Sequence, residues 1–549
     1  MDFGFPRVRP GWALALLAPF LAAQNLAEFE KKVGEFTLAN GMHFIVIERH
    51  QAPVVSFHAH VNAGSVNDPA GQTGLAHMFE HMIGKGTEVI GGHNPEAERK
   101  ALAEVEDALD AWEAEKRKGD QALPKVAAKL EAQYELAVRA AGIWVVPNQY
   151  PALIELNGGV GFNASTAPDF TTYHYSLPSN RIELWFLLQS EWFRRPVFRE
   201  FYKERDVVLE ERRSNIDSSP AGRLEETLLA TAFSAHPYRA VTGWASDIGG
   251  LRVPGAEQFH RTYYAPGNIT IAIAGDIRLA DAKRLADKYF AAIPAGPLPK
   301  APATTEPEQE GERRVAIAST SQPILTVSYK RPDQRHADDP VFDVLAVLLA
   351  GGRTGLLYKD LVRDQKLAVD VDVDPAFPGC KYPCLFQVTV VPAVGHRIEE
   401  NEKALLERIE VIRNEKVDDA ALARVKTKVR ASVIHQLDGN AGLAAQLAFY
   451  HVHYGNWRIL FTGLNRINQV SAEDVERVAS RYLGARSRTV AHTAPPGDPS
   501  VAAAPPSPAQ VKPAAAEVKP AAQAKRTAKA GPPPKTKPKP APTRRRRRR

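Results

Sequence analysis

Residues 77 to 81 read His-Met-Phe-Glu-His, and this run constrains the chain more than any other stretch. Side chains at i and i+4 of an α-helix lie on one face, so His77 and His81 reach a common ion only if the segment is helical. Glu80, three residues after His77, lies on the same face. Apolar residues recur at helical spacing between residues 71 and 83, and this pattern also predicts a helix.

Two histidines and a carboxylate are the usual protein ligands of catalytic zinc, which leave a fourth position open. The order His-x-x-Glu-His is the inverse of the common His-Glu-x-x-His motif and forms a class of its own. Three fixed residues are a modest constraint, however, and two histidines four residues apart also occur by chance on surface helices. The motif alone leaves both interpretations open.

The N-terminus predicts export. Arg7 and Arg9 precede an apolar run of 12 residues, Trp12 to Ala23, which is too short to cross a bilayer and ends in small residues. We therefore interpret residues 1–23 as a signal peptide and expect a periplasmic or secreted protein. A weak, uncleaved membrane anchor is the alternative.

The body of the chain divides into two units of similar size, residues 24–296 and 313–493, joined by a Pro- and Glu-rich linker at 297–312. Each unit has β-branched and aromatic strand patterns together with amphipathic helices. We predict an α+β fold of two similar domains, each a mainly antiparallel sheet packed with helices. Two charged helical patterns within residues 95–141 predict an antiparallel helical hairpin inserted into the first domain.

The positive formal charge of the chain resides in its C-terminal tail. Residues 494–549 are rich in Pro, Ala and Lys and end in an arginine run, Arg544 to Arg549, whereas the rest of the chain is mildly acidic. This composition predicts a disordered extension. The run could contact an anionic surface, such as phospholipid or lipopolysaccharide phosphates. No nucleic acid is expected as a partner of an exported protein.

The chain has two cysteines, Cys380 and Cys384. An oxidising compartment would favour a local disulfide across a turn, and two free thiols are equally compatible with the sequence.

Further motifs follow the pentapeptide in order. GLAHMFEHMIGKGT surrounds it, and NAST…D..T.Y, KERDVVLEERR and AFSAHPY come later. This order resembles the M16 (insulinase and pitrilysin) metallopeptidase family over roughly residues 36 to 490. The resemblance is closest to members with two domains per chain, which include the mitochondrial processing peptidase subunits and their bacterial relatives. It implies that the two domains form half of a clam-like chamber.

The resemblance also implies zinc on the two motif histidines, Glu80 as general base, and a carboxylate from a later helix as third ligand. In the family this carboxylate lies seven residues after another acid. Here Glu204 precedes Glu211 by seven residues, which places both on one helix face. Glu210 is the competing candidate, and we predict Glu211. For Glu204, a role in orienting a ligand and a solvated helix charge both remain open.

Peptide substrates are implied as well, bound by main-chain hydrogen bonds along the edge strand at 161–166, with Asn163 and Ala164 as substrate-binding residues. An ordinary core-packed strand is the alternative. In the second domain Arg363 matches a substrate-binding arginine of the family, but Val369 stands at or near the place of its tyrosine. This departure implies a second M16-like subunit that carries the Arg/Tyr pair, hence a heterodimer.

The sequence therefore predicts an exported zinc metalloendopeptidase that hydrolyses peptides or unfolded protein segments. Two other functions remain open. One is a catalytically silent core or assembly subunit of the same fold, although such chains usually lose a metal residue. The other is a binding protein tethered by its basic tail.

Overall fold

The computed structural model describes residues 29–501. The predicted signal peptide and nearly all of the predicted tail lie outside these residues. Within 29–501, no helix combines the length and the hydropathy that crossing a membrane requires.

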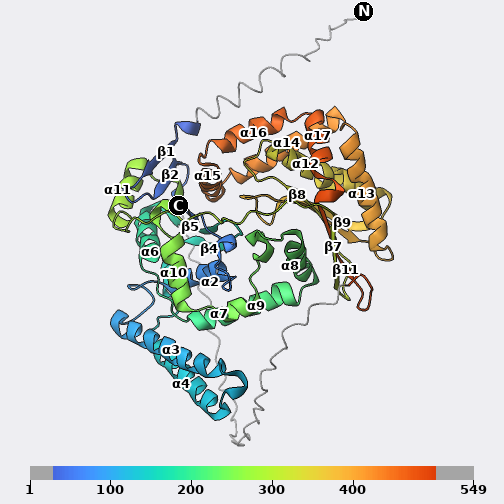
Figure 1. The fold of residues 1–549 in the computed structure, drawn as a ribbon. Coiled ribbons are helices and arrows are strands. Elements are labelled where there is room, and N and C mark those ends of the chain that lie inside the picture. Colours follow the sequence, from blue (N-terminus) through green and yellow to red (C-terminus); the bar gives the residue numbers. More distant parts are fainter. Residues whose placement is uncertain (1–28, 502–549) are drawn as a thin grey trace, which may run out of the picture. The chain divides into compact units, whose positions relative to one another are not determined.

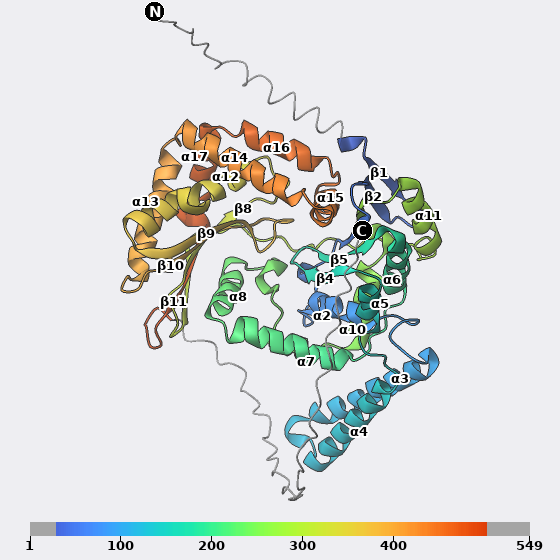
Figure 2. The same ribbon diagram turned by 180° about the vertical axis from the view of Figure 1, so that it is seen from behind.

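Two sheets organise the described chain (Figures 1 and 2). The first has the strand order β1-β2-β6-β3-β5-β4, and the second has the order β7-β11-β8-β10-β9. The strands of the first sheet are β1 (Val33–Thr37), β2 (His43–Glu48), β3 (Val54–Val61), β4 (Val160–Thr166), β5 (Thr171–Pro178) and β6 (Ile269–Gly275). Those of the second are β7 (Arg313–Ala318), β8 (Leu325–Arg331), β9 (Ala368–Phe377), β10 (Cys384–Pro392) and β11 (Arg488–Ala494).

The two sheets repeat one topology. In each, the last strand in sequence inserts between a parallel neighbour and an antiparallel one: β6 lies between β2 and β3, and β11 lies between β7 and β8. The other strand pairs are antiparallel. The predicted α+β class, with two similar sheet-and-helix halves, is confirmed.

Helices cover both sheets. Those of the first half are α2 (Leu75–His81), α3 (Pro95–Lys116), α4 (Pro124–Gly142), α5 (Gln149–Leu156), α6 (Ile182–Arg194), α7 (Phe201–Arg212), α8 (Pro220–Ala232), α9 (Ala245–Gly249), α10 (Val253–Tyr263) and α11 (Leu279–Tyr289). Those of the second half are α12 (Asp339–Ala350), α13 (Ile398–Asn414), α14 (Asp419–Gln436), α15 (Asn440–Tyr454), α16 (Ile459–Gln469) and α17 (Ala472–Tyr482).

Strand β6 shows how the first sheet is covered on both faces. All of its residues are buried. Its three isoleucines, Ile269, Ile271 and Ile273, belong to the main core of the first half, whereas Ala272 and Ala274 pack with residues of α15 from the second half. The small alanines leave room for this helix to lie against the strand. Conversely, α8 of the first half packs on β7 and β11 of the second sheet.

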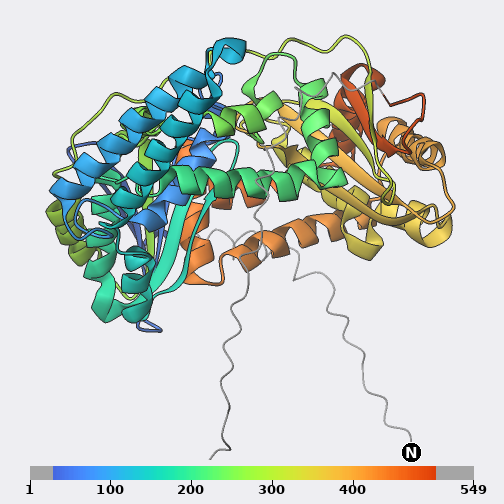
Figure 3. The same ribbon diagram turned by 90° about the horizontal axis from the view of Figure 1, so that it is seen from below.

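Helices α3 and α4 form an antiparallel pair, the blue hairpin in Figure 3. At its base the Arg199 guanidinium donates to both oxygens of Glu98, at 2.5 and 2.8 Å, and both side chains are almost fully buried. Along its seam the rings of Trp112 and Tyr134 stack at 5.5 Å. The hairpin is therefore fixed to the segment that leads into α7.

The loop before β10 joins the two halves. Cys380 and Cys384 form a disulfide, which settles the alternative that the sequence left open. Between them, the Lys381 ammonium donates to the Asn62 side chain at 2.5 Å, and the Lys381 amide donates to Asp169 at 3.1 Å. Residues 297–312 form no helix or strand.

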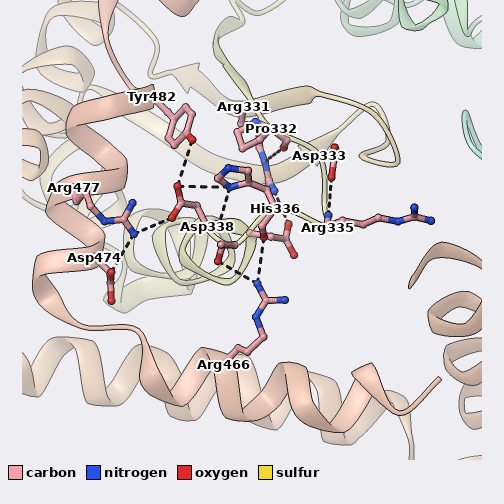
Figure 4. Close-up of polar contacts among 12 residues, drawn as sticks. Arg331, Pro332, Asp333, Arg335, His336, Asp338, Arg466, Asp474, Arg477 and Tyr482 are labelled. Carbon is pink, nitrogen blue, oxygen red and sulfur yellow. Dashed lines mark hydrogen bonds and ion pairs between the residues drawn. The ribbon is translucent and has the colours of Figure 1, made fainter. Parts of the chain in front are cut away.

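At the start of α12, the Asp338 carboxylate accepts two hydrogen bonds (Figure 4). It accepts a hydrogen bond from the Arg477 guanidinium at 2.8 Å and one from the Tyr482 hydroxyl at 3.4 Å. The Arg466 guanidinium donates to the backbone oxygens of His336 and Ala337. This network ties α12 to α16 and α17.

Three histidines, His58, His60 and His174, lie on one face of the first sheet. His58 and His60 are two residues apart on β3, and the ring of His58 stacks on that of His174 on β5, with ring centroids 5.8 Å apart. Burial, reinforced by His174, lowers the pKa of His58 to about 3. Burial also lowers the pKa of His60 well below its usual value, helped by nearby His453, His58 and Lys381. These imidazoles are neutral in the folded protein.

We predict that acidification destabilises the protein through these groups. Their folded pKa values lie below the unfolded value near 6.5, so the unfolded chain binds more protons and stability is lost as pH falls from 6.5. For His58 alone the loss is about 2 kcal/mol at pH 5. The free energy of unfolding of His58→Phe, measured with urea, should fall less between pH 7 and pH 5 than that of the wild type. His435→Gln, which changes an exposed histidine, should keep the wild-type slope, and equal slopes in all three proteins would contradict the prediction.

Candidate metal centre

The metal motif lies on α2, whose start is fixed by two carboxylates. Asp68 accepts hydrogen bonds from the amides of Gly74 at 2.7 Å and Ala76 at 2.8 Å. Asp247 accepts from the amide and the hydroxyl of Thr73, at 3.2 and 2.8 Å. Gly74 has a φ of 92°, which favours glycine at this turn. These contacts set the direction in which α2 leaves the loop.

The sequence of α2 separates its apolar and polar faces. Its buried residues are Leu75, Ala76, Met78 and Phe79. The remaining side chains, those of His77, Glu80 and His81, are half-buried. The helical prediction for this segment holds, and its polar face turns away from the core.

Three ligand atoms converge at one point. His77 Nε2 lies 3.2 Å from His81 Nε2, and Glu211 Oε2 lies 3.7 Å from the first and 3.5 Å from the second. Tetrahedral zinc with bonds of about 2.0–2.1 Å keeps its ligand atoms about 3.3 Å apart. The two imidazole planes stand at 86° to each other, and the rings approach through their Nε2 atoms. The donor set and its spacing fit zinc.

The third member of this cluster comes from α7. Glu211 faces α2, whereas the Glu210 carboxylate is exposed and pairs with the Arg213 guanidinium at 2.7 and 2.9 Å. Next to Glu211, the buried Arg212 binds both oxygens of Glu226 on α8, at 2.8 and 3.1 Å. This pair fixes the end of α7, and therefore the position of Glu211.

Glu204 contacts His81 on the side of the ring that faces away from the cluster. Its Oε2 is 3.6 Å from His81 Nδ1, and its Oε1 is 2.5 Å from the Lys85 ammonium. The contact with His81, together with that from Lys85, lowers the pKa of Glu204 to about 2 despite partial burial. The carboxylate is therefore an anion that can orient the His81 ring through its far nitrogen. Of the two roles that the sequence left open, the geometry favours this one.

The remaining motif residue, Glu80, is half-buried beside the end of β4. Burial raises the pKa of its carboxyl, although neighbouring Thr166 and His81 act in the opposite direction. A carboxylate with a raised pKa is a better proton acceptor than an exposed one. Glu80 does not join the His77 cluster as a ligand atom.

A cavity of about 220 Å³ adjoins the cluster. Its lining includes His77, Glu211 and Thr166 and a set of apolar residues: Val208, Ile216, Val241 and Ile248. A larger cavity of about 680 Å³ lies elsewhere, beside Lys31, Lys32 and His50, and contains none of the cluster residues.

Strand β4 forms one edge of the first sheet and contacts α2. Asn163 is exposed on this strand, whereas Ala164 faces inward and packs against the core. The outer main-chain edge is not paired with any described strand. Asn163 and Ala164 thus lie on the strand that contacts the motif helix.

The structure does not bring Arg363 to the cluster. Arg363 lies in the segment Tyr358–Asp364, where its guanidinium pairs with Asp364 at 2.6 and 2.7 Å. Among the described residues, no hydrogen bond joins it to the metal cluster. Val369, at the expected tyrosine position, is 52% exposed on β9.

Sequence reasoning missed Asp68, Lys85, Arg212 and Asp247. A signal exists for Lys85 alone, because it follows His81 by four residues, on the same side of a continued helix. Asp68, Arg212 and Asp247 act through contacts with other segments of the chain, and no local pattern marks them.

Two family models match the chain. One, described as "Insulinase (Peptidase family M16)", matches residues 44–103 and 145–243, and these segments contain all the cluster residues. The other, described as "Peptidase M16 inactive domain", matches residues 256–429. The first match is interrupted where most of α3 and α4 lie.

Individual proteins show the same likeness. Zinc protease PqqE of Helicobacter pylori is 24% identical over 484 residues, which cover 86% of this chain and 95% of that protein. The crystal structure of a protease from Helicobacter pylori superposes with a TM-score of 0.71 at 22% identity, over 84% of this chain and all of that one. The periplasmic protease PqqL of Escherichia coli has a TM-score of 0.62 at 15% identity, over 84% of this chain and 48% of that one.

We predict that Glu211→Gln and His81→Ala each lose the one zinc that the His77 cluster would hold, whereas Glu210→Gln retains it. The first two changes remove a converging ligand atom, and the third removes an exposed carboxylate one residue away. Metal content per chain after dialysis measures the outcome. Equal loss in the Glu210 and Glu211 variants would refute the choice of third ligand.

Proposed function

The chain belongs to the M16 (insulinase) family of peptidases, and from this premise we propose that it is a zinc-dependent endopeptidase acting on peptides or unfolded protein segments. The observation that carries the proposal is the convergence of His77, His81 and Glu211 beside Glu80 and a free strand edge. Relatives named as zinc proteases support the choice of metal.

Each residue of the cluster has a separate task. His77, His81 and Glu211 would hold zinc, and Glu204 orients His81. When bound, zinc supplies Lewis-acid polarisation of the scissile carbonyl and makes water acidic enough to react near neutral pH. Glu80 accepts the proton of the attacking water and returns it to the leaving amine.

Substrate binding is proposed along β4. An extended peptide adds to the outer edge through main-chain hydrogen bonds, which depend little on its sequence. Asn163 and Ala164 lie on this edge strand, which contacts α2. The apolar part of the adjoining cavity would accept a hydrophobic side chain next to the scissile bond. Holding the peptide extended in this way supplies much of the rate through positioning.

Export to the periplasm or beyond is part of the proposal. It rests on the sequence of residues 1–23, and one similar protein, from Escherichia coli, is described as periplasmic. Contact of Arg544–Arg549 with an anionic surface is proposed on charge alone.

The alternative of a catalytically silent subunit is less well supported. The term "inactive domain" belongs to the match over residues 256–429, whereas every cluster residue lies in the other match. The cluster retains its three ligand atoms and the neighbouring glutamate.

We predict that Glu80→Gln keeps its zinc but loses peptide hydrolysis by at least about 100-fold, since the ligands stay and the proton acceptor is removed. Metal analysis and cleavage of a fluorogenic peptide measure the two properties. Glu210→Gln is the matched control and should keep both. Undiminished turnover in Glu80→Gln would show that Glu80 is not the base.

The second prediction of this function is a heterodimer. Arg363 is exposed, lies apart from the cluster and has Val369 in place of the expected tyrosine. We expect weak activity from the purified chain, and a rise when a second M16-like chain carrying the Arg/Tyr pair is added. The rise follows if that pair holds the substrate against β4. Light scattering would measure the oligomeric state, and peptidase assays would measure activity with and without the partner. Full activity of the isolated chain, unchanged by such a partner, would contradict the heterodimer.

A further inference from the structure

A second group of metal-ligating side chains lies away from the catalytic cluster. Glu35 and Thr37 lie on β1, and His43 lies on β2. Thr37 pairs directly with His43 across the two strands, so alternation along β1 puts Glu35 and His43 on one face of the sheet. Helix α15 of the second half lies against this sheet and brings His451 to the same place.

The three donor groups are close. His43 Nε2 is 3.6 Å from Glu35 Oε2, and the rings of His43 and His451 stack at 4.0 Å. One ligand atom from each residue lies within 4.8 Å of the other two. Among the described residues, this group and the His77 cluster are the sets of three or more ligating side chains that approach so closely.

Two ring nitrogens in this group make no hydrogen bond among the described residues. His43 Nε2 and His451 Nδ1 are buried, and neither makes a hydrogen bond with any described residue. Buried polar atoms are nearly always satisfied, so each such atom requires an explanation. A single cation coordinated by both nitrogens would satisfy them at once.

The surroundings orient two of the three ligands, His43 and Glu35. His43 Nδ1 lies 2.9 Å from the Thr37 hydroxyl, which can accept its proton and leave the lone pair of Nε2 free. The Arg458 guanidinium donates to Glu35 Oε1 at 3.1 Å and leaves Oε2 facing His43. Such outer hydrogen bonds to a histidine and a carboxylate are typical of metal centres.

We propose that Glu35, His43 and His451 form a second transition-metal site, which fastens α15 of the second half to the first sheet. Two imidazoles and a carboxylate suit Zn²⁺, whereas Mg²⁺ and Ca²⁺ prefer oxygen ligands. The rings are nearly parallel, at 7°, so one must turn before both nitrogens face a single ion. The catalytic cluster is already convergent, and the second site therefore binds zinc more weakly.

The site is independent of the proposed function, and its test starts from a chain that lacks the catalytic metal. Full-length His81→Ala is dialysed against micromolar ZnCl₂ and analysed for metal. We expect about one zinc per chain in this variant and about two in the wild type. Adding His451→Asn or Glu35→Gln to His81→Ala should remove the remaining zinc, and adding His435→Asn, which changes an exposed histidine, should not.

Two further readouts separate a metal site from a folding defect. Zinc should raise the thermal midpoint of His81→Ala but not that of His81→Ala with Glu35→Gln, whose changed side chain is exposed. Cu²⁺ in His81→Ala should show electron paramagnetic resonance coupling to two nitrogens, and to one after His451→Asn. No zinc uptake by His81→Ala, or equal uptake with and without His451 and Glu35, would overturn the proposal.

Discussion

The Glu204 carboxylate is the contact on which the geometry of the candidate metal centre depends, because it joins the two helices that carry the converging ligand atoms. Helix α2 supplies both histidines and α7 supplies Glu211, and neither helix can form the site alone. Glu204 reaches from α7 to His81 and to Lys85, just beyond α2. Its side chain and that of Lys85 are mostly buried, at 14% and 19% exposure. Loss of one partner of such a pair costs about 3–5 kcal/mol when burial is complete, and somewhat less here.

The same helix connects the metal centre to the second half of the molecule. Arg212 at the end of α7 binds Glu226 on α8, and α8 packs on the second sheet. In the opposite direction, α15 packs on the first sheet, beside the proposed second metal site. Each half thus contributes a helix that packs on the sheet of the other.

Local patterns in the sequence were enough for the helix of the motif and for most strands. β-Branched and aromatic residues predicted strands in both units, and helical spacing predicted α2 and the two helices of the hairpin. The spacing of Glu204 and Glu211 identified the face of α7 that meets α2. The disulfide between Cys380 and Cys384 could not be decided, because both outcomes fit the same turn.

The sequence by itself determined that His77 and His81 can bind one ion, because ligand type and helical spacing are local properties, and the family resemblance pointed to Glu211 as the third ligand. Only the tertiary structure decided what holds them there. Asp68, Asp247 and Arg212 act across contacts between segments far apart in the chain, and no local pattern records such a contact. The approach of His451 to His43 has the same origin, since it arises only when α15 crosses from one half to cover the sheet of the other.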